Sequence, residues 1–335
     1  MRAVAAVARG VLGMLEIPRP EISDPYECLV RMEACAICNS TDPKLLKGEF
    51  RSGPFPTVLG HEVIGTVVET GSHVLNFREG DLVFREVLRD DHVPGGRSTW
   101  GGFAEYGIVT DRWARDGFPY LHHSDDYPAH PQQKVMLDTT PALATGMITL
   151  METLDYIAGC GAGPGRAVAV VGTGPVGQAF ALFAKLLGAG PVVAFGRRSG
   201  PAQRLASAAR ADEYVWLPDD LERQIEQRRF DIVVEAVGSR EALATCLRLA
   251  GERGAVCCYG VAPESEPYTE AQSGDSRLRN VPVLEGRAQR RLVEFVEAGG
   301  LRLEDWVSGT LPLAEYERAF ELVADRQAVK IALLP

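Results

Sequence analysis

The stretch Gly172-Thr173-Gly174-Pro175-Val176-Gly177 is the strongest indicator of the fold class of this chain. It follows an apolar run, 167–171, that is typical of a buried strand, and it precedes an apolar helical segment, 176–187. Glycines at this spacing let a strand turn tightly into a helix, let the backbone approach a pyrophosphate and let the helix pack on the strand. The unpaired N–H groups of the helix N-terminus then face the anion. The sequence therefore predicts a dinucleotide site formed by Gly172, Gly174, Pro175, Val176 and Gly177.

Strand-like and helix-like segments alternate around this motif. Continuous Val/Ala/Ile runs between helical segments predict a parallel sheet covered by helices on both faces. The expected strands are 167–171, 192–195, 214–217, 231–236, 255–259 and 281–284, and the expected helices are 145–157, 176–187, 201–209, 221–228 and 240–250. We therefore expect a doubly wound α/β Rossmann domain over residues 141–285.

The residues outside this region have a different sequence pattern. Residues 1–140 carry many Pro and Gly residues between short apolar runs, which indicates an irregular, strand-rich domain. The segments after residue 286 do not continue the Rossmann alternation and are expected to pack on that first domain. Since 335 residues are too many for one ordinary core, we expect two domains, 1–140 with 286–335, and 141–285.

Composition excludes several classes of partner. The formal net charge of −10 argues against binding to nucleic acid or to anionic membrane surfaces. No apolar run reaches the roughly 18 residues that a membrane-spanning helix needs. The start of the chain reads as a strand rather than a leader, so the seven cysteines are expected to be free thiols or metal ligands in the cytoplasm.

The end of the second expected strand bears on the choice of cofactor. NAD-specific sites usually carry a carboxylate about 20 residues beyond the glycines. Here that position reads Gly196-Arg197-Arg198, with two guanidinium groups that can bind a 2′-phosphate. The pattern predicts a preference for NADP over NAD; the alternative is that the arginines form a solvated loop.

A second group of reactive residues lies ahead of the glycines. Cys38 and the tripeptide Gly60-His61-Glu62 offer a thiolate, an imidazole and a carboxylate, which can make most of a catalytic zinc site with one position open. Each residue alone is more often a packing residue. Together with a dinucleotide site they predict metal-assisted hydride transfer to or from an alcohol or a carbonyl.

The ordered set of motifs resembles the medium-chain zinc-dependent alcohol/polyol dehydrogenases over nearly the whole chain. The segments that carry the resemblance are 34–42, 60–65, 79–81, 101–106, 172–177, 235–238 and 328–330. The resemblance implies a GroES-like catalytic domain beside the Rossmann domain, a catalytic zinc ion, a small-molecule alcohol or ketone as substrate, and a homodimer or homotetramer.

The resemblance also implies roles for single residues. Cys38 and His61 match the first two zinc ligands, and Glu62 matches an acidic residue at or near the metal. Ser40 matches the hydroxyl of a proton relay, with Thr41 as the alternative because the chain is one residue longer here. Further residues match cofactor-contacting positions: Thr145 near the nicotinamide, Val237 and Gly238 in a turn, and Lys330 at the phosphates.

The sequence departs from the family pattern at two places that bear on zinc binding. The region 84–101 lacks the four cysteines of a structural zinc lobe, so we expect no structural zinc. Pro141 stands where the remaining catalytic ligand is expected. Asp138, Glu62 or the histidines at 122, 123 and 130 could replace that ligand, or zinc could be weak or absent.

The departures leave alternative functions open. One is a zinc-free NADPH-dependent quinone or enoyl reductase of the same fold, and another is a dinucleotide-binding protein without turnover. The polar segments 89–98 and 122–130 favour a polyol-like or sugar-like substrate.

Overall fold

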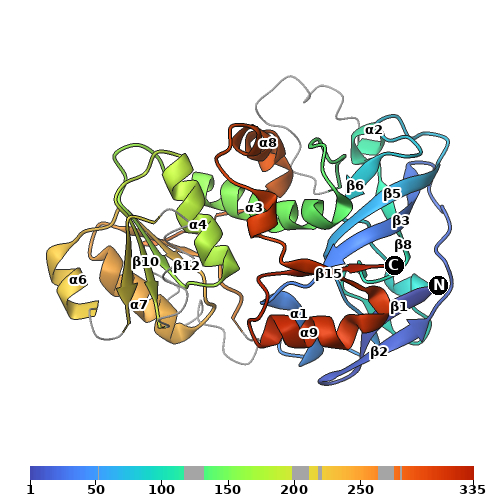
Figure 1. Cartoon of the computed structure of the whole chain (residues 1–335), viewed down its shortest axis with the longest axis horizontal. Helices are drawn as coiled ribbons and strands as arrows, with labels where there is room; N and C mark the ends of the chain where they lie inside the picture. Colours follow the sequence, from blue (N-terminus) through green and yellow to red (C-terminus); the bar gives the residue numbers. More distant parts are fainter. Residues whose placement is uncertain (52, 117–131, 198–210, 218–220, 263–274, 280) are drawn as a thin grey trace. The chain divides into compact units, whose positions relative to one another are not determined.

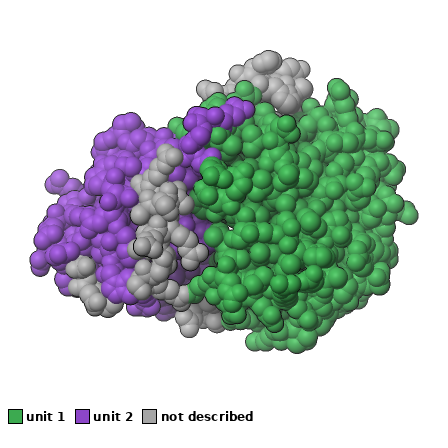
Figure 2. Space-filling model, viewed as in Figure 1, with its two compact units in different colours: residues 1–151, 284–296, 302–335 green, residues 152–283, 297–301 purple. Residues whose placement is uncertain are grey.

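The computed structural model describes residues 1–51, 53–116, 132–197, 211–217, 221–262, 275–279 and 281–335. The chain forms two compact units (Figure 2). Unit 1 comprises residues 1–151, 284–296 and 302–335, and unit 2 comprises residues 152–283 and 297–301. The expected boundary at 140/141 lies at the start of helix α3 (Pro141–Gly159). The two units divide within this helix, between Met151 and Glu152.

Unit 2 is built on a parallel sheet of six strands, which confirms the predicted Rossmann fold. The order is β11-β10-β9-β12-β13-β14, and every neighbouring pair is parallel. The strands are β9 (Val168–Val171), β10 (Val192–Gly196), β11 (Glu213–Trp216), β12 (Ile232–Glu235), β13 (Ala255–Cys258) and β14 (Leu278–Arg279).

Helices pack on both faces of this sheet. Gly177 of α4 (Pro175–Leu186) lies near Val170, whereas α7 (Arg240–Ala250) joins the core cluster of Ala169 and Val171. Successive residues of a strand point to opposite faces, so the two helices cover opposite sides. Helix α6 (Leu221–Gln227) and the C-terminal part of α3 also belong to this unit, and the helix expected over 201–209 lies outside the described residues.

The predicted strand at 281–284 is wrong. The closing strand is β14, where Leu278 pairs with Val256, and residues 281–284 form no strand. Val283 is 39% exposed, so its apolar pattern does not mark a buried strand. The segment instead leads the chain back to unit 1 at Leu284.

Unit 1 contains two sheets and resembles the expected irregular, strand-rich domain (Figure 1). One sheet has the order β2-β1-β4-β7, formed by Val11–Glu16, Arg2–Ala8, Thr57–Val58 and Arg97–Ser98. The other has the order β15-β16-β3-β5-β6, formed by Gly309–Pro312, Ile331–Leu334, Glu27–Ala36, Glu62–Thr70 and Leu82–Phe84, with β8 (Tyr106–Thr110) also paired to β3. The C-terminal strand therefore completes a sheet that begins near the N-terminus.

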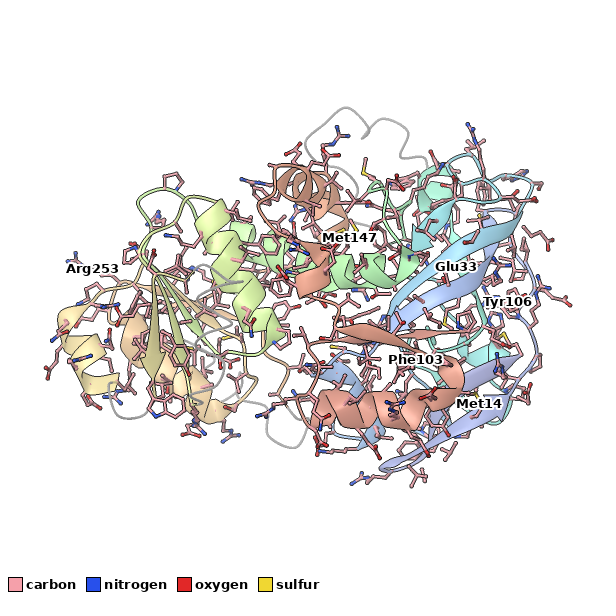
Figure 3. All side chains as sticks on the ribbon, in the orientation of Figure 1. Met14, Glu33, Phe103, Tyr106, Met147 and Arg253 are labelled. Carbon is pink, nitrogen blue, oxygen red and sulfur yellow. The ribbon has the colours of Figure 1, made fainter. Side chains whose placement is uncertain are left out.

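Short helices accompany these sheets. They are α1 (Thr41–Leu46), α2 (Arg112–Asp116), α8 (Gln289–Glu297), α9 (Tyr316–Ala324) and the 3₁₀ turns Asp90–His92, Glu285–Ala288, Leu303–Asp305 and Leu313–Glu315. Phe103, labelled in Figure 3, packs edge-on against Phe320 of α9 with ring centroids 6.0 Å apart. Full burial of such a ring stabilises the fold by about 1.5–3 kcal/mol, so this core holds the C-terminal helix on the N-terminal sheets.

Within the described ranges, no helix combines the length and the apolar character needed to cross a membrane.

Glu86 places a carboxyl group inside unit 1. The residue is 1% exposed, and among the described residues neither of its oxygens has a hydrogen-bond partner. Two glycines make room for it, since a Cβ at Gly65 would lie 2.2 Å from Oε2 and one at Gly107 would lie 2.8 Å from Cγ. Burial, assisted by the charge of Glu33, raises the pKa of the Glu86 carboxyl well above its ordinary value.

This raised pKa predicts a loss of stability with rising pH. The folded protein keeps the Glu86 proton at pH values where the unfolded chain has released it, so stability present below the unfolded-state pKa is lost as pH rises toward the folded-state pKa. From pH 5 to 8, the unfolding free energy of the wild type should fall relative to Glu86→Gln, by up to about 1.4 kcal/mol per pH unit. Urea unfolding of metal-free protein measures the difference, and parallel pH profiles of the two proteins would contradict the prediction.

Candidate functional site

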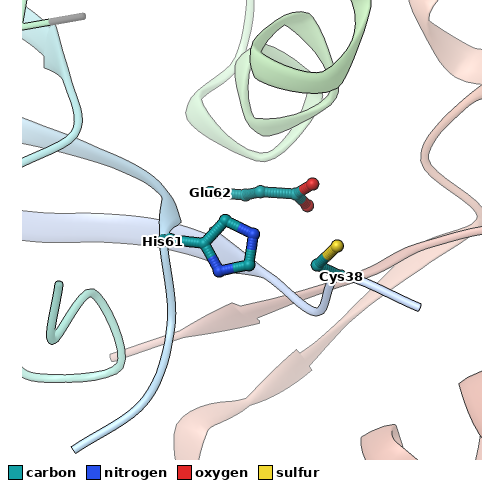
Figure 4. Close-up of side chains that lie close together, drawn as sticks. All are labelled: Cys38, His61 and Glu62. Atoms are coloured by element: carbon teal, nitrogen blue, oxygen red, sulfur yellow. The ribbon is translucent and has the colours of Figure 1, made fainter. Parts of the chain in front are cut away.

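Cys38, His61 and Glu62 converge in unit 1 (Figure 4). Cys38 follows β3, and His61 and Glu62 lie at the start of β5. Antiparallel pairing of these strands places Ala36 opposite Glu62, which brings the two segments together. One ligand atom from each side chain lies within 4.8 Å of the others. Thiolate, imidazole and carboxylate are the donor types that zinc takes in proteins, so the residues present fit a zinc ion.

The turn before His61 requires a glycine. Gly60 has φ +91°, a backbone conformation that costs a residue with a side chain about 1–2 kcal/mol. A Cβ there would also lie 2.5 Å from the backbone N of Phe103. That backbone is held in turn, because Phe103 N donates to the Leu59 carbonyl at 2.9 Å. Close packing of two backbones thus sets the direction in which His61 leaves the turn.

Asp42 connects two of the candidate ligands. It is fully buried, and its Oδ2 accepts a hydrogen bond from the Cys38 N–H at 2.8 Å. Its Oδ1 lies 3.4 Å from His61 Nδ1 without hydrogen-bond alignment, so the contact is mainly coulombic. Burial lowers the pKa of His61, but Asp42 and Cys38 more than offset this and hold the pKa well above its ordinary value. The negative charge of Asp42 beside Nδ1 favours a ring orientation that leaves Nε2 for a metal.

Glu62 has two further partners in unit 1. The Thr149 hydroxyl donates to Glu62 Oε1 at 2.6 Å, and the Lys330 ammonium contacts Glu62 Oε2. Lys330 also donates to Thr149 Oγ1 at 3.1 Å. All three side chains are buried, and Lys330 is 5% exposed. The Lys330 ammonium therefore lies directly against the Glu62 carboxylate inside unit 1.

The other residues expected at the metal lie in different surroundings. Asp138 is exposed and does not belong to the cluster, and Pro141 opens helix α3, where a proline at the first position is favourable. Ser40 precedes α1 and Thr41 begins it, both half-buried and a few residues from Cys38. The histidines at 122, 123 and 130 lie outside the described residues.

Asp42 and Thr149 are functional candidates that the sequence patterns did not indicate. Asp42 had a signal, since it is a carboxylate four positions after Cys38 in a helix-initiating segment. Thr149 had none, because it is one of several hydroxyls on a long helix. Lys330, expected at the cofactor phosphates, is instead buried against Glu62.

The glycine turn of unit 2 has the geometry that its sequence predicts. Gly172 has φ +121° at the end of β9, and Gly174 caps α4; apart from its chain neighbours, no atom of the described residues lies within 4 Å of the position a Cβ would take there. Pro175 is the first residue of the helix, and Val176 follows it. A Cβ at Gly177 would lie 2.0 Å from Gly172 O, so only glycine allows this approach of helix and strand.

Of the other residues expected at the cofactor, Gly196 and Val237 lie beside this turn, whereas Thr145 belongs to unit 1. A Cβ at Gly196 would lie 2.4 Å from Thr173 Cγ2, and Val237 Cγ2 lies 3.1 Å from the corresponding position at Gly172. Gly238 adopts φ +82° next to Val237. Thr145 belongs to unit 1, is fully buried, and donates from its hydroxyl to Ala142 O at 2.6 Å.

Arg197 has a partner that the sequence patterns did not indicate. Its guanidinium pairs with Glu241, in the first turn of α7, and both side chains are largely exposed. The pairing raises the pKa of Arg197 and lowers that of Glu241. Arg198 lies outside the described residues.

A Rossmann unit with a tight glycine turn, together with a β-rich unit that gathers a thiol, an imidazole and a carboxylate, defines the class of two-domain dehydrogenases. Residues 24–116 match the family model described as the alcohol dehydrogenase GroES-like domain, and residues 175–296 match the one described as zinc-binding dehydrogenase. The chain belongs to the medium-chain dehydrogenase family and is an alcohol/polyol oxidoreductase.

Known proteins resemble the chain along most of its length. It is 27% identical to D-arabinitol dehydrogenase 1 of Uromyces fabae over 339 residues, which cover 93% of this chain and 91% of that one. It is also 27% identical to the NADP-dependent isopropanol dehydrogenase of Thermoanaerobacter brockii over 280 residues, 79% and 77% of the two chains. Among solved structures, alcohol dehydrogenase TADH from Thermus sp. ATN1 superposes with a TM-score of 0.78 at 24% identity, covering 100% of this chain and 99% of that one. This last likeness supports the fold.

Proposed function

We propose that the protein is a zinc-dependent oxidoreductase that transfers a hydride between NADP(H) and a secondary alcohol or its ketone, with a polyol-like or sugar-like substrate. The observation that carries the proposal is the convergence of Cys38, His61 and Glu62 within 4.8 Å. The zinc-free reductase predicted as the alternative has no need for this donor set. A relative named for D-arabinitol adds support for a polyol.

Each group of residues has a separate role in the proposed reaction. Cys38, His61 and Glu62 would hold the metal, and bound zinc supplies Lewis-acid polarisation of the substrate oxygen. Asp42 orients the His61 ring, and the Lys330 ammonium balances the Glu62 carboxylate. The hydroxyl of Ser40 or Thr41 would move the substrate proton, and the glycine turn of unit 2 would orient the cofactor.

The decisive experiment combines metal analysis with steady-state kinetics. We expect zinc in the purified protein, loss of turnover of polyols and secondary alcohols after chelation, and recovery when zinc is returned. Full turnover by metal-free protein on an activated double bond would instead support the zinc-free reductase. Tight NADPH binding without turnover on any alcohol or ketone would support a non-catalytic role.

The proposed NADP preference depends on Arg197. Its guanidinium is exposed at the end of β10, where it could bind a 2′-phosphate after exchanging Glu241 for the ligand. An exposed ion pair contributes little, so the exchange costs little. A relative named as NADP-dependent supports the same preference.

Replacing this arginine tests the preference. Arg197→Ser should lower kcat/KM for NADP roughly 10–150-fold, since a hydrogen bond to a charged group contributes about 1.5–3 kcal/mol. The value for NAD should stay unchanged, because NAD has no 2′-phosphate. Glu241→Gln is the matched control and should keep or raise the value for NADP. An equal loss with both cofactors would contradict the assignment.

A further inference from the structure

Arg85 is a buried arginine that contacts the backbone of the candidate metal centre. It follows β6 in unit 1, and its Nη1 donates to the carbonyl oxygen of His61 at 2.8 Å. Its own backbone N–H donates to the Val63 carbonyl at 2.9 Å. Arg85 therefore binds the carbonyl before Glu62 and the carbonyl after it.

The position of the His61 carbonyl affects both His61 and Glu62. The peptide group is planar, so the His61 C=O, the Glu62 N–H and both Cα atoms move as one unit. A charge-assisted hydrogen bond to this carbonyl thus sets the direction of two neighbouring ligand side chains at once. Small rotations of this peptide would move the imidazole and the carboxylate in different directions.

Glu285 holds the guanidinium in place. Arg85 Nε and Nη2 donate to Glu285 Oε1 and Oε2 at 2.5 and 2.9 Å, in a bidentate pair that is buried on both sides. Glu285 also neutralises a positive charge that would otherwise oppose a metal cation. The two residues are 200 positions apart in the sequence. Glu285 begins a 3₁₀ turn of the C-terminal part of unit 1.

The backbone of Arg85 is itself constrained. Its φ of +58° lies in the left-handed region, which is energetically unfavourable for a residue that has a side chain. Such conformations persist where the surrounding contacts over-determine them. The Gln132 side chain supplies one such contact by donating from Nε2 to Arg85 O at 2.9 Å. The arginine is thereby held at both its main chain and its guanidinium.

We propose that Arg85 and Glu285 form a positioning pair that holds the His61–Glu62 peptide in the geometry required for metal binding. The inference rests on the proposed function, because it assumes that these ligands bind a metal. It gives the pair a role beyond packing: metal affinity should depend on it even where stability does not.

A double variant separates the two roles. Replacing a buried ion pair by apolar residues is often neutral for stability, whereas removing one partner leaves a buried charge. Arg85→Met/Glu285→Leu should therefore unfold at a urea concentration near that of the wild type, yet lack the donor to His61 O. The matched control is Arg2→Met/Glu105→Leu, which removes another two-donor Arg–Glu pair of unit 1.

The measurement is a cobalt titration of metal-free protein, followed by the thiolate-to-cobalt absorption band. We expect the dissociation constant for Co²⁺ to rise roughly 10–100-fold in the Arg85→Met/Glu285→Leu variant, as for other outer partners of metal ligands, with an altered band. Arg85→Lys, which keeps one donor, should bind with intermediate affinity and gives a milder variant if the double one does not fold.

Three results would overturn the inference, and they are distinguishable. Wild-type affinity and an unchanged band in folded Arg85 variants would remove the positioning role and leave the metal centre intact. A wild-type protein that binds no cobalt would remove the proposed function and this inference with it. Equal weakening in the Arg2→Met/Glu105→Leu control would also count against a specific role for Arg85.

Discussion

Glu62→Gln is expected to weaken zinc binding by more than about 100-fold, beyond the 10–100-fold loss typical of outer partners. The amide cannot supply the negative oxygen that Glu62 places within 4.8 Å of the Cys38 and His61 ligand atoms. Turnover should fall with the metal. Chelator competition measures zinc affinity without relying on activity.

The same substitution should also destabilise the metal-free protein. It leaves the Lys330 ammonium buried without its counter-charge, and breaking a buried pair in this way costs about 3–5 kcal/mol. Glu62→Gln/Lys330→Met should recover much of this stability, measured by urea unfolding, but should not recover zinc binding. The two variants thus separate ligation from folding.

Asp138→Ala is the control for this prediction. Asp138 is exposed and stands outside the cluster, so its removal should leave zinc affinity and stability near wild-type values. The opposite result, with zinc lost from Asp138→Ala and retained by Glu62→Gln, would transfer the ligand role to Asp138.

Gly60→Ala is expected to destabilise the protein by about 2–5 kcal/mol and to lower its metal affinity. The positive φ contributes about 1–2 kcal/mol and the clash with the Phe103 backbone, 2.5 Å away, a further 1–3 kcal/mol. Relief of that clash has to move the turn, and His61 moves with it. Urea unfolding and zinc competition measure the two effects.

Gly80→Ala is the matched control, because it measures the free-energy cost of the positive φ without a steric clash. Gly80 has φ +88°, against +91° for Gly60, but within the described part of the chain no atom beyond its own neighbours in sequence lies within 4 Å of its Cβ position. It should cost only about 1–2 kcal/mol and leave metal affinity unchanged. Equal destabilisation by the two substitutions would show that the contact with Phe103 does not constrain the turn.

Local sequence patterns were sufficient to predict most of unit 2. The turn at Gly172 and Gly177 depends on steric limits between residues a few positions apart, so its conformation follows from the local order of residues. The strand predicted at 281–284 shows where such patterns fail. An apolar run indicates a strand only weakly, whereas the pairing that makes a strand, Leu278 with Val256, joins distant residues.

The donor types of the candidate metal centre, the glycine turn and the family all follow from the amino-acid sequence alone. Thiol, imidazole and carboxylate are properties of single residues, and glycine positions follow from local backbone geometry. The surroundings of the ligands, in contrast, depend on the tertiary structure. Lys330 contacts Glu62 across 268 positions, and Glu285 holds Arg85 across 200. Such contacts arise when strands and helices pack into one unit, and neither spacing nor periodicity records them.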